Sequence, residues 1–333
     1  MSFPMPLQNE SLPGEITTVE SAVRGVWRNV RALRVNDKYL TVRGKYLTLA
    51  VVHEEEWLVS DLEDPDLCIQ LLKEQTGKGL RADIFTFSVK PSTTPPRHPY
   101  YSEMDSVAVI RLGTFKEWWE GLPQETRKNV RRAQKRGVVV KVEPFTDELI
   151  RGIMEVNNDS PVRQNVRFVH YGKSFEQVKK DQASFLDHCD FICAYCESEM
   201  VGFLKIVYRG DVASILQILP KASHQDKRPG NALIAKAVEL CEAKGISYIT
   251  YGLFNYGNKK DSPLREFKIR NGFGELLVPR FYIPLTFWGK FCLKLKLHRG
   301  LIGILPHTVI TTAVRARAVC YNFFHSKAGV AQR

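Results

Sequence analysis

The sequence predicts an α/β fold in which helices flank a mixed, mostly antiparallel sheet. Three apolar runs, at residues 191–195, 200–208 and 212–219, are separated by short polar turns, a pattern typical of an antiparallel meander. The last run opens a strand–loop–helix–strand unit that ends at residue 252. A separate set of short strands and one helix precedes residue 90, which indicates a second, smaller lobe.

The smaller lobe is predicted over residues 21–100, after a polar leader over residues 1–20 that lacks a signal-peptide pattern. The polar residues 43–45 separate two apolar runs and predict a hairpin. Residues 64–65, Asp-Pro, predict the start of a helix that runs to about residue 75. The Pro-rich stretch 91–99 predicts the boundary to the next domain. Strands of this lobe are predicted at residues 39–42, 46–52, 57–60 and 84–89.

The larger domain is predicted over residues 101–283, followed by a basic and apolar tail over residues 284–333. Its first helical region is interrupted at Pro123 and ends at Gly137. Further helices are predicted at residues 146–158, 175–189 and 230–244, and further strands at residues 107–112, 138–142 and 246–252.

Composition limits the classes of protein that fit. A hydrophobic share of 44% with 25% charged residues is typical of a folded soluble chain. No apolar run reaches the roughly 18 residues of a membrane span. Seven scattered cysteines favour a reducing cytoplasm over a disulfide scaffold. The net charge of +12 indicates either a basic soluble surface or an anionic partner: nucleic acid, a phosphorylated ligand or a membrane. We therefore expect a cytoplasmic protein, with peripheral contact at the inner face of a membrane as a further hypothesis.

The loop that precedes the helix at residues 230–244 carries the main chemical signal. It is basic, through Lys227 and Arg228, and it ends in Pro-Gly-Asn at the helix start. A helix N-terminus presents free backbone N–H groups and the positive end of the helix dipole. Gly230 allows a ligand to approach the backbone closely. The loop therefore suits a pyrophosphate, although an ordinary basic turn with proline at a helix start has the same appearance.

Three motifs in the same order resemble the GNAT superfamily of acyltransferases, and its FemAB-like branch in particular. The meander followed by strand, basic Gly-containing loop, helix and strand resembles the acyl-CoA core of that superfamily. The stretches LPQETRKNVRRAQKRGVVV and LREFKIRNGFGE resemble the basic helix that enters the FemAB-like lobe and the segment that ends it. The resemblance extends to BioF2-like acetyltransferase domains. It implies two GNAT-like lobes in tandem, with the first one degenerate.

The resemblance also implies a donor site. The family loop is Gln/Arg-x-x-Gly-x-Gly/Ala, whereas this chain has one glycine, two residues after Arg228. Acetyl-CoA or another acyl-CoA is the implied donor substrate, and a backbone N–H near residues 217–219 would polarise its carbonyl. No metal is expected. The residues assigned to donor binding are Gln217, Ile218, Leu219, Lys227, Arg228, Gly230, Asn231 and Ala232.

Direct transfer from a thioester to an amine needs an oriented donor, a polarised carbonyl and a base, but no enzyme nucleophile. By position in the family pattern, Tyr251 and Tyr256 are candidates to protonate the leaving thiolate. Glu266 and His224 are candidate bases, and Lys268 is a candidate to stabilise an oxyanion or bind phosphate. For Glu266 and His224 a structural role is the alternative, and for Lys268 the alternative is an exposed lysine in a helix.

Two basic segments are candidates for substrate binding. On the helix before Gly137, Arg127, Arg131 and Lys135 form one row and Lys128, Arg132 and Arg136 the adjacent row. Such a double row suits phosphates or lipid headgroups, or forms a solvated face. The second segment lies between two helices, where GNAT folds place acceptor-binding residues. Together the assigned residues are Arg127, Arg131, Arg163, Gln164, Arg167, His170 and Tyr171.

Three functions stay open from the sequence. The first is transfer of an acyl group, most simply acetyl, from acyl-CoA to an amine acceptor such as an envelope or polysaccharide precursor. The second is FemAB-like transfer of an aminoacyl group from tRNA to a cell-envelope precursor. The third is a non-catalytic basic adaptor for nucleic acid or anionic membrane. The tail, with Phe287, Trp288 and Phe291 beside lysines, predicts either packing on the first lobe, which we favour, or a helix in a membrane interface.

Overall fold

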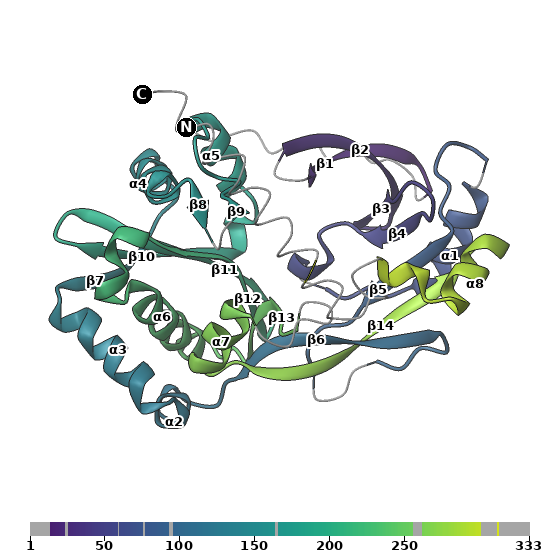
Figure 1. The fold of residues 1–333 in the computed structure, drawn as a ribbon. Helices are drawn as coiled ribbons and strands as arrows, with labels where there is room; N and C mark the ends of the chain where they lie inside the picture. The colour runs from purple at the N-terminus through teal and green to yellow at the C-terminus, as the bar shows by residue number, and fades with distance from the viewer. Residues whose placement is uncertain are drawn as a thin grey trace. The chain divides into compact units, whose positions relative to one another are not determined.

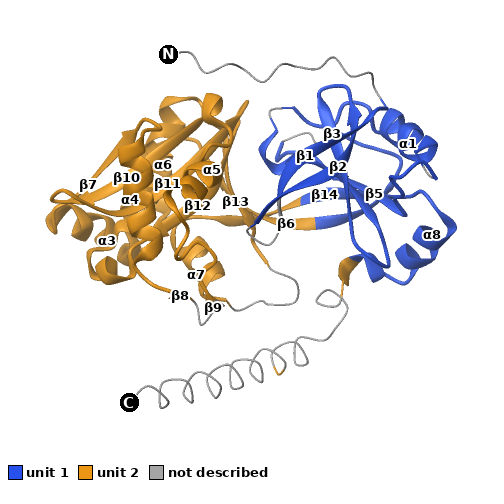
Figure 2. Cartoon of the chain, turned by 90° about the horizontal axis from the view of Figure 1, so that it is seen from above, with its two compact units in different colours: residues 1–104, 278–298 blue, residues 105–277, 299–333 orange. Residues whose placement is uncertain are grey.

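The computed structural model describes residues 14–23, 26–58, 60–75, 77–92, 96–163, 166–255, 262–300 and 312. Contacts within the chain divide it into two compact units (Figure 2). Unit 1 comprises residues 1–104 and 278–298, and unit 2 comprises residues 105–277 and 299–333. Unit 1 is therefore discontinuous in sequence, a division that differs from the linear domains expected above.

The strands of unit 1 are hydrogen-bonded in the order β1-β2-β3-β4-β5-β14. All neighbours are antiparallel except β4 and β5, which are parallel because helix α1 connects them. The elements are β1 (Ile16–Val23), β2 (Val26–Val35), β3 (Lys38–Arg43), β4 (Leu49–Val52), η1 (Glu55–Trp57), α1 (Pro65–Glu74), β5 (Ile84–Ser88), β14 (Gly274–Pro284), α8 (Phe287–Lys294) and η4 (Leu297–Arg299).

Unit 2 contains a sheet with the order β7-β10-β11-β12-β13-β6, again with a single parallel pair, β12 and β13. Its strands are β6 (Tyr101–Arg111), β7 (Val138–Glu143), β10 (Cys189–Cys196), β11 (Glu199–Arg209), β12 (Val212–Pro220) and β13 (Tyr248–Leu253), beside the small pair β8 (Val162–Arg163) and β9 (Val166–Arg167). Its helices are α2 (Phe115–Gly121), α3 (Gln124–Lys135), α4 (Asp147–Asn158), α5 (Phe175–Gln182), η2 (Leu186–His188), η3 (Ala222–Lys227), α6 (Pro229–Ala243) and α7 (Pro263–Arg270).

The two units repeat one pattern of strand pairing. In each, four antiparallel strands are followed by a connecting helix, a parallel neighbour and a final antiparallel strand. That final strand is exchanged between the units. Val107 to Arg111 of β6 pair with β13 in unit 2, although β6 follows β5 in the chain. Arg280 to Pro284 of β14 pair with β5 in unit 1, although β14 follows the elements of unit 2.

The core of unit 2 has two layers, one on each face of its sheet. Helix α6 packs on one face, together with α2 and α3, around residues such as Leu233, Val238 and Ile249. Helices α4 and α5 pack on the other face, around Ile153 and Phe203. Figure 1 shows this division, with α4 and α5 on one side of β10 and β11 and with α6 on the other. The fold is thus the mixed, mostly antiparallel sheet flanked by helices that the sequence predicts.

Unit 1 is the simpler of the two repeats. Only two residues separate β1 from β2, whereas α4 and α5 separate the corresponding strands β7 and β10 of unit 2. Unit 1 therefore lacks, within the described residues, the two helices that cover one face in unit 2. This is the degenerate first lobe that the resemblance implies.

Most elements lie where the sequence predicts them, and three predictions are wrong. Ile16–Val23 forms β1, so the leader does not extend to residue 20, and β2 was not predicted. Residues 55–57 form a short 3-10 helix instead of a strand at 57–60. The helix expected at 175–189 ends at Gln182, because β10 begins at Cys189.

Helix α8 packs on unit 1, which is the packing that the sequence analysis favoured for the tail. A Cβ atom on Gly289 would overlap the carbonyl oxygen of Asp83, so the helix backbone lies directly against the start of β5. Thr286 caps the helix and its hydroxyl donates to Asp83 at 2.9 Å. No helix in the described part of the chain is long and apolar enough to cross a membrane.

Candidate active site

The parallel strands of unit 2 separate part-way along their length. β12 and β13 pair only from Val212 to Ser214, although β12 runs on to Pro220 and β13 to Leu253. At the last pair, the hydroxyl groups of Ser214 and Thr250 lie 2.6 Å apart, and Arg209 donates to Ser214 at 3.1 Å. Beyond this buried polar cluster β12 and β13 are not paired within the described residues, so an opening lies between the two strands.

A β-bulge lies in β12 at the opening. Lys205 of β11 pairs with Gln217 and the next residue, Ile206, pairs with Ile215, so Leu216 is the extra residue. Gln217 and Ile218 are half-buried here, and Gln217 accepts a hydrogen bond from Gln182 at 2.9 Å. Bulges re-aim backbone groups, so residues 216–218 are in a position to direct an N–H into the opening.

Lys205 holds the neighbouring loop in place. Its side chain is fully buried, and its ammonium group donates to the carbonyl oxygens of Gln182 at 2.7 Å and Ser184 at 2.6 Å. A buried ammonium ion needs such acceptors. Lys205 therefore acts as a support behind the bulge.

The loop after β12 leads into α6 through Arg228, which has a left-handed conformation with φ of 57°. Pro229 is the first helical residue, and no side chain of the described residues caps the helix. A Cβ atom on Gly230 would meet Pro220 at 3.7 Å and Phe267 at 3.8 Å, which are ordinary contacts. Neither its φ angle nor crowding by the protein requires glycine there, and glycine leaves the backbone at the helix start accessible.

A pocket of about 450 Å³ opens beside this helix start. It lies between the first turns of α3 and α6 and helix α7. Its charged lining residues are Arg228 and Arg270 together with Glu125 and Glu266, and Arg270 is paired with Glu266. The lining residues are Pro123, Glu125, Thr126, Asn129, Arg228, Asn231, Pro263, Glu266, Phe267, Arg270 and Asn271.

Lys227 and Asp226 tie the loop to neighbouring elements. The ammonium group of Lys227 lies 3.0 Å from the sulfur of Cys196 at the end of β10. Arg136, just after α3, donates to the carboxylate of Asp226 at 2.7 Å and to its carbonyl oxygen at 2.8 Å. Arg136, the residue that follows α3, therefore helps to hold this loop in place.

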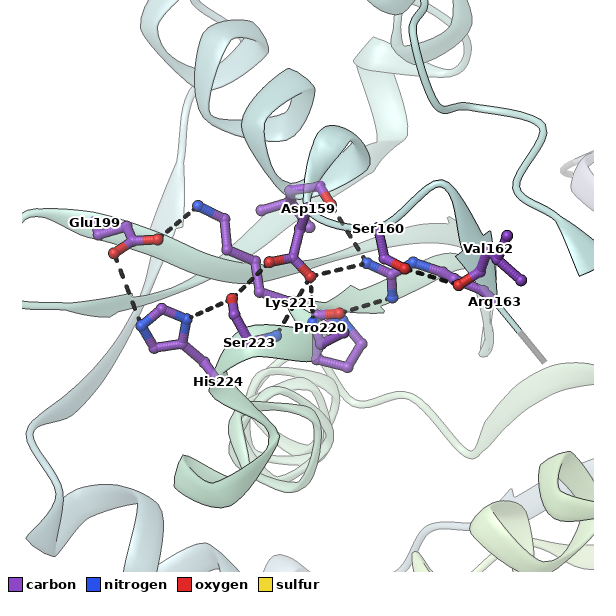
Figure 3. Close-up of polar contacts among 11 residues, drawn as sticks. Asp159, Ser160, Val162, Arg163, Glu199, Pro220, Lys221, Ser223 and His224 are labelled. Atoms are coloured by element: carbon purple, nitrogen blue, oxygen red, sulfur yellow. Dashed lines mark hydrogen bonds and ion pairs between the residues drawn. The ribbon is translucent and has the colours of Figure 1, made fainter. Parts of the chain in front are cut away.

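A polar network fixes the other side of the loop (Figure 3). The hydroxyl of Ser223 donates to Asp159 at 2.5 Å, and Ser223 lies 3.0 Å from Nδ1 of His224. Nε2 of His224 is 3.7 Å from Glu199. Both ring nitrogens of His224 thus face protein partners, which favours a structural role over that of a general base.

Asp159 is the centre of this network. Burial alone would raise the pKa of its carboxyl group. Hydrogen bonds from the Ser223 hydroxyl and from the backbone N–H groups of Ala222 and Ser223, with the guanidinium of Arg163 nearby, instead hold that pKa below its ordinary value. The ionised carboxylate therefore fastens the end of α4 to the loop that leads into α6.

Two predicted catalytic residues come together on the α6 side of the sheet. The ammonium group of Lys268 lies 4.6 Å from the ring centre of Tyr251, and it donates to the carbonyl oxygen of Leu253 at 2.6 Å. Lys268 is fully buried, which the sequence analysis did not anticipate for a lysine of a short helix. Glu266 lies elsewhere on α7, exposed and paired with Arg270. Tyr256 lies outside the described residues.

The residues assigned to donor binding divide into two groups. Lys227, Arg228 and Gly230 lie at the entrance to α6 as expected, and Asn231 lines the pocket. Ala232 and Leu219 are buried in the two opposite core layers. The pocket adds Phe267, Arg270 and Asn271, which the sequence analysis did not single out although they lie within the quoted motif LREFKIRNGFGE.

The residues assigned to acceptor binding are spread over both faces of the sheet. Arg127 and Arg131 lie on α3, on the α6 side. The other segment lies between α4 and α5 on the opposite side. There Arg163 turns inward and donates to the carbonyl oxygen of Pro220 at 2.9 Å (Figure 3). Of the remainder, Arg167 and Tyr171 are exposed, His170 is 3.5 Å from Asp181, and Gln164 lies outside the described residues.

Helix α1 of unit 1, which corresponds to α6 of unit 2, has acidic instead of basic residues at its start. Asp64 caps α1 by accepting a hydrogen bond from the N–H of Leu67 at 2.9 Å. Asp66 adds negative charge in the first turn, and Asp61 and Glu63 precede it. The carboxylate of Asp64 thus takes a backbone N–H at the start of α1 that a bound anion would otherwise use.

The cysteines of β10 do not form a metal site. Cys193 is buried in the core, where burial raises the pKa of its thiol to about 12. Within the described residues, no group of three or more His, Cys, Asp and Glu side chains could hold a metal ion.

The sequence and the structure were compared with known proteins. Residues 124–260 match the family model of the acetyltransferase (GNAT) domain. No sequence among the curated proteins matches the chain significantly.

Several solved structures share the fold of most of the chain. L-PGS from Bacillus licheniformis has 15% identity and a TM-score of 0.53, over 82% of this chain and 89% of that one. FemX has 11% identity and a TM-score of 0.51, over 79% and 88%. The C-terminal domain of a putative lysylphosphatidylglycerol synthetase from Agrobacterium fabrum has 12% identity and a TM-score of 0.51, over 80% and 87%.

The matched acetyltransferase (GNAT) domain, residues 124–260, makes the chain an acyltransferase. The chain shares the fold of L-PGS and FemX over most of its length, and its GNAT domain lies within unit 2. It is therefore an enzyme, and the non-catalytic adaptor considered from the sequence is set aside.

Proposed function

We propose that the chain transfers an acyl group from acyl-CoA to an amine acceptor by direct attack. One observation carries the choice of donor: the start of α6 combines an uncapped helix N-terminus, a glycine that protein packing does not require, and a polar pocket with Arg228 and Arg270. These are the features that a pyrophosphate with further phosphate groups would use.

The proposed reaction forms one C–N bond and breaks one C–S bond. The amine nitrogen attacks the thioester carbonyl, the thiolate of CoA leaves, and the nitrogen gives one proton to solvent water, from which Tyr251 regains the proton that it supplies to the thiolate. A backbone N–H at residues 216–218 would stabilise the negative charge on the carbonyl oxygen. Tyr251 would supply a proton to the thiolate, and Lys268, whose ammonium group lies against its ring, would stabilise negative charge in this region.

We propose that the acceptor enters from the α4–α5 side of the opening. The segment from Arg167 to Tyr171 presents exposed polar and aromatic side chains there. An amine on a cell-envelope or polysaccharide precursor is the substrate class we favour. We propose a cytoplasmic location, where acyl-CoA is available.

Calorimetry with CoA and acetyl-CoA tests the donor. We expect saturable binding to the wild type and release of free thiol when acetyl-CoA is mixed with an accepted amine. The runner-up is an aminoacyl-tRNA donor, which the exposed cations Lys128, Arg131 and Lys135 of α3 would suit. Absence of CoA binding, together with tight binding of charged tRNA, would replace acyl-CoA by that donor.

A further inference from the structure

The outer face of α8 in unit 1 is apolar and uncovered by any described residue. Gly289 and Cys292 face unit 1 and are buried. On the opposite side Phe287, Phe291 and Leu295 form an i, i+4, i+8 ridge with exposed fractions of 87%, 47% and 51%. A helix that packs one face on its own domain does not need a second apolar face for folding.

Exposed aromatic side chains are concentrated on α8. Every exposed phenylalanine or tryptophan among the described residues lies on α8: Phe287, Trp288 and Phe291. Trp288 stacks on Phe291 at 5.7 Å and donates from its indole N–H to the carbonyl oxygen of Tyr46 at 3.0 Å. Tyr46 is itself 83% exposed and extends the patch. Aromatic rings that are apolar at one end and polar at the other suit a membrane–water interface.

Positive charge surrounds the patch. Lys290 and Lys294 form the row next to the ridge, and Lys45 and Lys296 flank it, all exposed. Downstream of Glu275 the sequence contains nine Lys and Arg residues and no Asp or Glu, so this stretch accounts for +9 of the net charge of +12. Of the acidic residues near the helix, Asp83 is buried beneath it, and Glu103 is engaged by Tyr101 at 2.9 Å and by His298 at 3.1 Å.

An apolar pocket of about 560 Å³ opens under the same helix. Tyr100, Tyr101 and Tyr282 form its wall, and Lys290, Lys294 and Lys296 lie at its rim. Aromatic and aliphatic walls with ammonium groups at the mouth match a molecule with a hydrocarbon part and an anionic head. A duplex polynucleotide, whose bases are already stacked and paired, would use the lysines but would leave the apolar ridge in water.

We propose that this face of unit 1 binds the surface of a bilayer that contains anionic phospholipids. The ridge of α8 enters the boundary between headgroups and acyl chains, the lysines contact lipid phosphates, and the pocket accepts part of one lipid. The proposal is independent of the acyl donor, since the patch belongs to unit 1 and the donor site to unit 2.

Sedimentation of the full chain with vesicles tests the proposal. We expect binding to phosphatidylcholine mixed with phosphatidylglycerol, weaker binding at raised salt, and little binding to phosphatidylcholine alone. Lys290→Glu with Lys294→Glu should weaken binding by about 20-fold or more, because each lysine at an anionic surface contributes about fivefold. Phe287→Ser with Phe291→Ser should abolish it.

The matched controls lie in unit 2. Lys116→Glu changes a lysine that is 80% exposed, and Val139→Ser an apolar residue that is 62% exposed; neither should alter vesicle binding. Absence of wild-type binding to anionic vesicles, or binding that both α8 double variants retain, would overturn the proposal. The proposal would also be overturned if the α8 double variants lost affinity for tRNA but kept their affinity for vesicles.

Quenching of tryptophan fluorescence by brominated lipid tests insertion of α8 without the double variants. It therefore applies even if a double variant fails to fold. The wild type should be quenched by anionic vesicles that contain brominated chains, and the conservative variant Trp288→Phe should lose most of that quenching while still sedimenting with the vesicles. Equal quenching in the wild type and in Trp288→Phe would contradict insertion of α8.

Discussion

The side-chain amide of Asn231, in the first turn of α6, donates to the side-chain oxygen of Asn271 at 2.9 Å. Asn271 is the residue that ends α7, is 1% exposed, and donates in turn to the carbonyl oxygen of Phe267 at 2.7 Å. The start of the helix proposed to bind phosphate is thus fixed by the end of the helix that carries Lys268. Donor and catalytic elements are coupled through this pair.

Asn231→Ala should lower the free energy of unfolding by about 1–3 kcal/mol, because the buried oxygen of Asn271 loses its donor. It should also reduce CoA affinity, since the first turn of α6 loses its lateral support. Chemical denaturation and calorimetry measure the two effects. An unchanged denaturation midpoint would show that Asn271 does not depend on this hydrogen bond.

Gly230→Asp should weaken CoA binding by at least about tenfold, or about 1.4 kcal/mol, through repulsion of the pyrophosphate and loss of close approach. Gly230→Ala is the matched control for the fold, because a Cβ atom there meets only ordinary contacts at 3.7 Å and 3.8 Å. The alanine variant should melt like the wild type. Equal CoA affinity in the wild type and the aspartate variant would remove the pyrophosphate from this position.

Lys268→Met should reduce kcat by about 100-fold or more if its ammonium group stabilises charge in the transition state. CoA affinity should change little, because Lys268 does not line the donor pocket. Ile269→Met, at a position of the same helix that is 41% exposed, serves as the control. A variant that folds and keeps a normal kcat would make Lys268 a structural residue that only supports the end of β13.

Gly289→Ala should destabilise the protein by about 1–3 kcal/mol or more, because the new methyl group would overlap the carbonyl of Asp83. Thermal melting measures the effect, and Leu295→Ala, at an exposed position just beyond the same helix, should leave the melting temperature nearly unchanged. A normal melting temperature for the Gly289 variant would contradict the close contact of α8 with β5.

Acid should weaken the network around Asp159. Its pKa is lowered in the folded state, so the stability it contributes is present above the ordinary carboxyl pKa near 4 and is lost as the pH falls through the lower folded value. Denaturation midpoints between about pH 6 and pH 3 should therefore fall more steeply for the wild type than for Asp159→Asn. Parallel curves would mean that the carboxylate has the same pKa in the unfolded chain.

Local sequence patterns were sufficient to predict helices and strands where the chain alternates clearly between apolar and polar residues. The meander and α6 were predictable because their apolar residues all face a core layer. Strand β2 was not, since Arg28 and Arg31 are exposed on it and only its second half is buried. The roles of Lys268 and Arg163 depend on carbonyl groups of distant segments, Leu253 and Pro220, which no local pattern encodes. The same holds for the exchange of β6 and β14.

That exchange has a consequence for synthesis on the ribosome. Ser88 of β5 emerges long before Arg280, its partner in β14, and residues 105–277 of unit 2 are translated in between. Through that interval the nascent first lobe presents an unpaired strand edge, which is prone to pair with other chains. The final strand of unit 1 is therefore synthesised only after the strands of unit 2. A fragment that ends at residue 104 lacks β14, so one edge of its strand β5 would stay unpaired.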